Sequence, residues 1–179
     1  MNIHQDLVVM DCGRSNVLLV ILRFHPDSMK HIKAVEAVNG LVKLMRVDGF
    51  TASTLKHLNV VKVNADSVVC EMPVAKAHLN VMDGLHGGVT ATIVDVMGSL
   101  AIAAKTGTVY TGVSTDITVQ YLSGGKLNDM LRIEADCPKA GKSLAFSHVR
   151  IFNGEKILAT GSHTKYVKQG PKLCFPAKE

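Results

Sequence analysis

The sequence predicts an α+β fold in which an antiparallel sheet wraps around one long central helix, with an additional helix nearer the N-terminus. The first observation is a run from His86 to Ala104 whose only acidic or basic residue, apart from the histidine, is Asp95; it has the length and composition of a core helix. The second is a series of short β-branched runs on both sides of this helix, separated by turn residues. A large sheet covers its apolar face with a single helix only by curving around it.

The first predicted helix follows a segment without clear periodicity, residues 1–28. Asp27 or Ser28 is a suitable N-cap for a helix that starts near Met29, because apolar residues then recur at three- and four-residue steps. Gly49 is the expected end of this helix.

A β-hairpin is predicted next. Two β-branched runs, residues 60–63 and 67–74, flank the turn Asn64-Ala65-Asp66. A loop over residues 75–84 then leads to the central helix.

The central helix is predicted over residues 86–105, with Gly107 as its C-terminal stop. Asn153-Gly154 is a strong signal for a two-residue hairpin turn among the strands that follow. Those strands are expected over residues 111–122, 130–137, 143–152 and 156–167. Such a sheet leaves exposed edges, which favours oligomerisation.

The chain of 179 residues fits one principal domain. We divide it into an N-terminal extension of uncertain structure (1–28), a domain over residues 29–167 and a flexible tail (168–179). No apolar run is expected to reach the roughly 20 residues of a membrane helix, and no membrane span is predicted.

Composition argues against a metal site and against nucleic acid as a partner. The four cysteines lack C-x-x-C spacing, which suggests a reducing compartment; we predict the cytoplasm, with the mitochondrion as the alternative. The net charge is +5, but the lysines and arginines are spread out and aromatic residues are few. A smaller polyanion, such as a nucleotide-bearing ligand, accounts for that charge equally well.

Asp95 is the most informative residue, since a charge among apolar residues is costly unless it is paired or used. On a helical wheel it shares a face with small residues, while the opposite face forms an ordinary apolar stripe. The small face comprises Gly88, Ala91, Thr92, Gly98, Ser99 and Ile102. Either a ligand or second backbone approaches Asp95 in a depression there, or the face is a close helix contact and Asp95 is structural.

Gly87 and Gly88 open the central helix, where backbone N–H groups lack intrahelical partners. Such groups form a possible oxyanion hole. Asp95 lies eight residues further on, roughly 12 Å along the axis. The two reach one reacting carbon only if two subunits place their helices side by side and antiparallel, so a site of this kind requires a dimer.

The motif Asn80-x5-His86-Gly87-Gly88-x6-Asp95, followed by Gly112-Val113-Ser114-x-Asp116 and Gly141-Lys142-Ser143-Leu144-Ala145-Phe146, resembles the hotdog-fold acyl-CoA thioesterases. The likeness extends from about Met29 to Val167. It is strongest to the group of thioesterase superfamily member 2 (acyl-CoA thioesterase 13) and the phenylacetate-pathway thioesterases.

The resemblance implies a role for each matched residue. Asn80 and the Gly87 N–H would polarise the thioester carbonyl, and Asp95 of the facing subunit would act as general base or as nucleophile. Ser114 would help to hold the attacking water. His86 would shape the loop around Asn80.

Two features of the following strand and loop qualify this picture. Strict alternation places Ser114 with Asp116, away from the valine face, unless a bulge near Gly112 turns it or it faces the partner subunit. Asp116, a rival carboxylate, is explained by solvation. The loop after the strand reads Ser123-Gly124-Gly125-Lys126-Leu127-Asn128-Asp129, where the family commonly has a proline and then Gly-Asp or Gly-Glu.

We therefore predict an enzyme, an acyl-CoA thioesterase that acts on a medium- or long-chain fatty or an aryl substrate, as a homodimer or dimer of dimers. Coenzyme A enters as part of the substrate, with no other cofactor; His86, Gly88, Lys126 and Lys142 are candidates to contact it. Two alternatives stay open: a non-catalytic acyl-CoA-binding protein of the same fold, and a dehydratase or hydratase, for which His86 would have to be essential.

Overall fold

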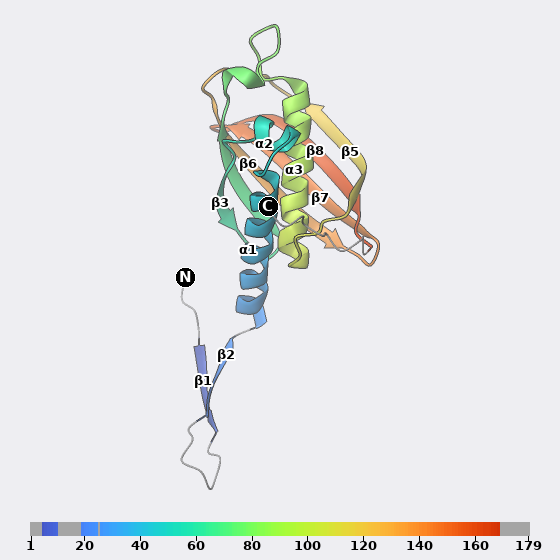
Figure 1. The fold of residues 1–179 in the computed structure, drawn as a ribbon. Helices are drawn as coiled ribbons and strands as arrows, with labels where there is room; N and C mark the ends of the chain where they lie inside the picture. The colour runs from blue at the N-terminus through green and yellow to red at the C-terminus, as the bar shows by residue number, and fades with distance from the viewer. Residues whose placement is uncertain (1–4, 11–18, 25, 169–179) are drawn as a thin grey trace, which may run out of the picture.

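The computed structural model describes residues 5–10, 19–24 and 26–168, with side chains from residue 26 onward. A six-stranded antiparallel sheet in the order β3-β4-β6-β7-β8-β5 curves around α3 (Figure 1). The elements are β1 (Gln5–Met10), β2 (Leu19–Phe24), α1 (Pro26–Met45), α2 (Phe50–Thr54), β3 (Asn59–Val63), β4 (Ser67–Pro73), the 3-10 turn η1 (Lys76–His78), α3 (Gly87–Thr106), β5 (Val113–Tyr121), β6 (Met130–Ala140), β7 (Leu144–Asn153) and β8 (Lys156–Tyr166). The predicted fold class is confirmed.

The core lies between α3 and the concave face of the sheet. Most of α3 is buried there, and β4, β6 and β7 contribute alternate residues to the same apolar cluster, to which β8 adds Leu158 and Ala159. α1 packs against α3 and closes the open side near β3. α3 ends as predicted at Gly107, whose φ of 66° is the left-handed conformation that glycine adopts at little cost.

The N-terminal third differs from the prediction at its element boundaries. α1 starts at Pro26, not near Met29, because a proline at the first helical position loses no hydrogen bond. It ends at Met45, before Gly49, and Gly49 instead precedes α2.

The N-terminal segment, which showed no clear period, contains an antiparallel pair, β1 and β2. The division into extension, domain and tail stays a prediction, and nearly all of the tail, residues 169–179, lies outside the described part of the chain.

α3 corrects the prediction about apolar runs, because by length and composition it could cross a membrane. Within the fold, however, 67% of the most apolar 18-residue stretch of α3 is buried, as in the core helix of a globular protein. The sheet and α1 occupy the surface that lipid would cover.

β5 is the exposed edge of the sheet beside α3. Eight of its nine residues are exposed and the other is half-buried. Val113, Ile117 and Tyr121 are large apolar residues among them.

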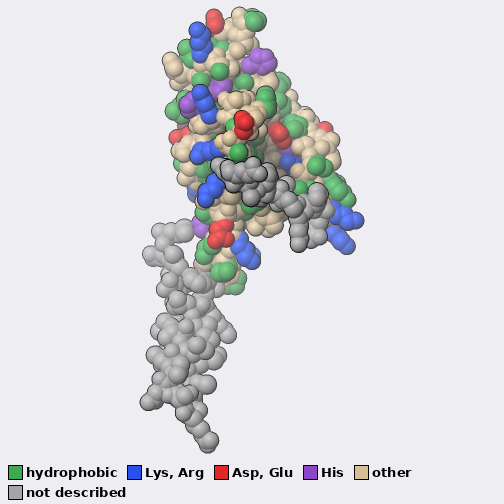
Figure 2. All heavy atoms as spheres, in the orientation of Figure 1, with side chains coloured by type: hydrophobic (Ala, Val, Ile, Leu, Met, Phe, Trp, Pro, Cys, Tyr) green, Lys and Arg blue, Asp and Glu red, His purple; other side chains and the backbone are tan. Residues whose placement is uncertain are grey.

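On the face in Figure 2, lysines and arginines lie among acidic and other side chains.

Candidate active site

The start of α3 presents the Gly87 N–H as a backbone donor, as the glycine pair predicts. His86 is the N-cap, and its Nδ1 accepts a hydrogen bond from the Gly88 N–H at 2.8 Å. Gly87 is the first helical residue, so its N–H has no partner within the helix. Tyr121 of β5 donates its hydroxyl proton to the Gly87 carbonyl at 3.1 Å, which connects the helix start to the edge strand.

Asn80 lies in the loop that precedes α3, with its amide held in one orientation. Its Oδ1 accepts hydrogen bonds from the N–H groups of Met82 (2.9 Å) and Gly84 (3.1 Å). Those bonds occupy the oxygen, so the donor that Asn80 offers is Nδ2. Gly84 also pairs with Lys126, which places this exposed lysine beside the loop.

The buried residue His78 fixes the same loop through two hydrogen bonds. Its carbonyl accepts a hydrogen bond from the His86 N–H at 2.8 Å, and its Nδ1 accepts one from the Ala75 N–H at 3.0 Å. Burial lowers the pKa of His78, which suits a neutral acceptor.

Asp95 lies eight residues after Gly87, on the face of α3 beside β5 and β8. Its side chain is 44% exposed. Its Oδ1 lies 3.4 Å from Ser114 Oγ and 3.5 Å from His163 Nε2. One carboxylate, one hydroxyl and one imidazole therefore meet at the surface of the helix.

A β-bulge in β5 brings Ser114 to this position. The pairing of β5 with β8 shifts between Ser114 and Asp116, which leaves Thr115 as the extra residue. Beyond the bulge Asp116 and Thr118 lie on the outer face of the sheet, where their side chains contact each other at 3.4 Å. The bulge resolves the conflict with strict alternation and separates Asp116 from Asp95.

His163 is fully buried, and its partners determine which nitrogen carries the proton. Nδ1 lies 3.1 Å from the carbonyl oxygen of Asp95, which only accepts, so Nδ1 is the protonated nitrogen. Burial lowers the pKa of His163; Asp95 opposes this change and Lys165 reinforces it. In the neutral ring Nε2 accepts the Ser114 hydroxyl proton at 2.9 Å, so the lone pairs of Ser114 Oγ stay available as acceptors.

Gly98 makes room for this arrangement between α3 and the sheet. A Cβ at this position would lie 2.6 Å from Ser147 Oγ and 2.9 Å from His163 Nδ1. Ser147 in turn donates a hydrogen bond to the His163 carbonyl at 3.1 Å. The absence of a side chain at Gly98 is therefore a condition for the position of the imidazole.

The small face of α3 is exposed near the start of the helix and buried further along. Gly98, Ser99 and Ile102 are buried under the sheet, whereas Gly88 is exposed and Ala91, Thr92 and Asp95 are half-buried. The buried turns of this face pack against β7 and β8 rather than against a second helix, and the approach of a ligand or second backbone to the exposed turns stays a prediction.

Sequence reasoning missed His163 and Lys165. Both occupy inward positions of β8, but the residues between and beside them, such as Ser162 and Thr164, are also polar. Alternation therefore gave no sign of which face was buried. No local signal in the sequence separates His163 and Lys165 from the neighbouring pair Ser162 and Thr164.

The candidate residues form two groups within one chain. Asn80, Gly87 and Lys126 lie at the start of α3, and Asp95 and Ser114 lie about 12 Å further along it. Lys142 is exposed in the β6–β7 turn, at the end of the sheet where β5 begins.

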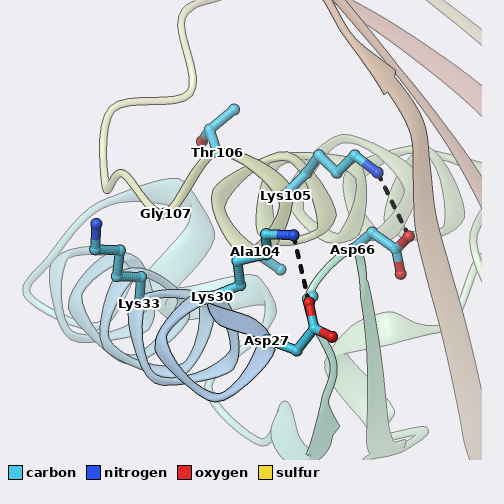
Figure 3. Close-up of a pocket in the computed structure, with 9 residues that line it drawn as sticks. Asp27, Lys30, Lys33, Asp66, Ala104, Lys105, Thr106 and Gly107 are labelled. Carbon is cyan, nitrogen blue, oxygen red and sulfur yellow. Dashed lines mark hydrogen bonds and ion pairs between the residues drawn. The ribbon is translucent and has the colours of Figure 1, made fainter. Parts of the chain in front are cut away.

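A separate cleft of about 430 Å³ lies at the C-terminal end of α3 (Figure 3). Two of its lysines pair with aspartates, Lys105 with Asp66 at 3.5 Å and Lys30 with Asp27 at 3.4 Å. None of the candidate catalytic residues lines it.

Metal-binding clusters of His, Cys, Asp and Glu are absent from the described residues. Cys70 and Cys137 are buried free thiols, and burial raises the pKa of Cys70 to about 12 and that of Cys137 to about 11. Neither is a thiolate nucleophile near neutral pH.

The model of the family described as "Thioesterase superfamily" matches residues 82–160, which contain both Gly87 and Asp95. Acyl-coenzyme A thioesterase 13 of Mus musculus is 36% identical over 126 residues, which cover 69% of this chain and 89% of that protein. The chain belongs to the thioesterase superfamily.

Solved structures of other thioesterases agree with this assignment. Zebra fish thioesterase superfamily member 2 superposes with a TM-score of 0.67 at 33% identity, over 73% of this chain and 95% of that one. A hypothetical thioesterase protein from Streptococcus pneumoniae TIGR4, crystallised with coenzyme A, gives a TM-score of 0.64 at 26% identity, over 71% and 96% of the two chains. The predicted hotdog thioesterase fold and enzyme class are confirmed.

Proposed function

We propose that this thioesterase hydrolyses acyl-CoA to a free acid and coenzyme A, at a site that combines Asn80 and Gly87 of one subunit with Asp95 and Ser114 of another. The observation that carries the proposal is the half-exposed Asp95 carboxylate beside Ser114, whose hydroxyl oxygen lies 2.9 Å from the buried imidazole of His163. The relatives named as acyl-CoA thioesterases, and the related thioesterase crystallised with coenzyme A, support the substrate class.

In the proposed reaction Asp95 takes a proton from a water that donates to the carboxylate and to Ser114 Oγ. The resulting hydroxide attacks the thioester carbonyl carbon. The Gly87 N–H and Asn80 Nδ2 stabilise the negative oxygen that forms. When the intermediate collapses, the C–S bond breaks and the coenzyme A sulfur receives the proton from Asp95.

The dimer is part of the proposal, because one chain holds its two groups about 12 Å apart. Ile117 and Tyr121 lie on the face of β5 that is turned toward α3, and Tyr121 reaches the helix start, where a second α3 could pack. In an antiparallel pair of helices, the loop with Lys126 of one subunit would approach the end of the sheet that carries Lys142 of the other. These two lysines are proposed to meet the phosphates of coenzyme A.

The test is free-thiol release from short, long and aromatic acyl-CoAs by wild type, Asp95→Asn and Asp116→Asn. Asp95→Asn should lower kcat by about 100-fold or more, since it removes the general base, and should leave the affinity for coenzyme A unchanged. Asp116→Asn is the matched control and should retain turnover, because that carboxylate lies on the outer face of the sheet. The panel also identifies the preferred acyl group.

Other outcomes would identify other functions. Tight binding without turnover on any substrate would indicate a non-catalytic acyl-CoA-binding protein. Hydration of an enoyl-CoA that depends on His86 would indicate a hydratase, although the bond from the Gly88 N–H supports a capping role for that histidine. Label in the Asp95 carboxylate after a single turnover in ¹⁸O-water would identify this residue as the nucleophile.

A further inference from the structure

Lys165 is a buried lysine directly behind the proposed catalytic group. It is 7% exposed, and its Nζ donates a hydrogen bond to Ser99 Oγ at 2.8 Å. Ser99 Oγ donates in turn to the backbone carbonyl of Asp95 at 3.0 Å, the oxygen that also accepts from His163 Nδ1. A chain of hydrogen bonds thus runs from the ammonium group of Lys165 to the backbone of Asp95.

A buried charge of this kind costs stability unless the protein compensates for it or uses it. Burial lowers the pKa of Lys165, and the Asp95 carboxylate opposes that decrease. Lys165 and His163 are two residues apart on the inward face of β8, so they share one environment behind Asp95.

The charged groups that act on His163 come from three elements. Asp95 acts from α3, Asp116 from β5 and Lys165 from β8 itself. β7 contributes the uncharged Ser147. Among these groups only Lys165 opposes the binding of a second proton to the imidazole.

A second proton on His163 would disable the site. It would bind Nε2, which would stop accepting from Ser114 and would instead form an ion pair with Asp95 at 3.5 Å. The carboxylate would then be occupied by an imidazolium and the Ser114 hydroxyl would rotate.

We propose that Lys165, held by Ser99, is a positioning residue whose buried ammonium group keeps His163 singly protonated and so leaves Asp95 and Ser114 available to the water. The inference rests on the proposed function for its catalytic consequence. The effect of Lys165 on the protonation of His163 does not depend on turnover.

The experiment is the pH dependence of kcat/KM for Lys165→Met, with Lys156→Met as control. Removing the buried charge makes proton binding to His163 easier, so the acidic limb of the profile moves to higher pH, by about one unit. Lys156 is exposed on the same strand, and its substitution should leave the limb in place. If kcat/KM of Lys165→Met falls at its plateau while the acidic limb of the pH profile stays in place, Lys165 has a packing role only and the proposal is overturned.

A second variant and a second readout keep the test decisive if Lys165→Met does not fold. Ser99→Ala deprives Nζ of its acceptor with little change in volume, and should move the limb in the same direction. Imidazole ¹⁵N NMR should find His163 neutral with the proton on Nδ1 in the wild type, and protonated at higher pH in the variants. Unchanged titration of His163 would overturn the role of Lys165, whereas absent thiol release with a shifted titration would contradict the proposed function alone.

Discussion

At the scale of single residues, the hydroxyl of Ser114 is expected to matter for rate and little for binding. Ser114→Ala removes the group that donates to His163 Nε2 and accepts from the water. We expect kcat to fall by about 10- to 100-fold, since a positioned partner of the base is lost, while KM stays close to that of the wild type. Steady-state kinetics on the preferred acyl-CoA measures both constants.

Thr118→Ala is the matched control for this change, because Thr118 lies in the same strand on the outer face. Equal losses of kcat in the two variants would mean that the hydroxyl of Ser114 has no special role.

Gly98 carries a prediction about stability. An alanine at this helical position gains about 1 kcal/mol of helix propensity, but its Cβ would lie 2.6 Å from Ser147 Oγ. Overpacking costs about 1–3 kcal/mol, so Gly98→Ala should lower the free energy of unfolding in denaturant titrations. Gly124, around which a Cβ would meet nothing within 4 Å, provides the control. A Gly98→Ala protein as stable as Gly124→Ala would show that the imidazole and Ser147 move aside without cost.

At the scale of elements, the central helix was predictable to within a residue because its signals are local. Gly107 and the glycine pair mark its ends, and its apolar residues have one period. The partners of Asp95 depend on long-range register, so local patterns do not predict them, and Ser114 was named only through the family resemblance. Ser114 reaches Asp95 through a bulge whose extra residue, Thr115, has no distinguishing feature in the sequence. Lys165 is buried by the pairing of β8 with its neighbours, which no local pattern encodes.

The start of α3 gives a prediction for the capping role of His86. His86→Ala loses the bond from the Gly88 N–H and should destabilise the protein by about 1 kcal/mol, with kcat largely retained. His86→Asn should recover the stability, because asparagine is among the preferred N-caps. Thermal unfolding and thiol release measure the two effects. Loss of thiol release in both variants with unchanged stability would contradict the capping role and indicate a direct part for His86 in thioester hydrolysis.

The edge strand gives a prediction for association. Ile117→Lys places a charge among the exposed apolar residues of β5 that we assign to the dimer, and burial of an unpaired charge is costly. We expect a monomer by analytical ultracentrifugation, with turnover lost. Thr118→Lys, on the opposite face of the same strand, should remain dimeric. A dimeric Ile117→Lys protein would show that association uses another surface.

At the scale of the whole molecule, the central expectation is that neither subunit holds a complete site. A mixture of two inactive variants tests this directly. In a heterodimer of Asp95→Asn with Asn80→Ala, one site combines the intact Asn80 of the first subunit with the intact Asp95 of the second, and the other site carries both substitutions. Random exchange makes half of the dimers mixed, so activity should return to about a quarter of the wild-type value.

If each chain completed its own site, both subunits of every mixed dimer would stay defective and no activity would return. A mixture of Asp95→Asn with Ser114→Ala is the internal control. Both residues belong to the same half of the site, and a heterodimer then has one defect in each of its two sites. Recovery in the first mixture but not in the second would therefore assign Asn80 and Asp95 to different subunits of one catalytic site.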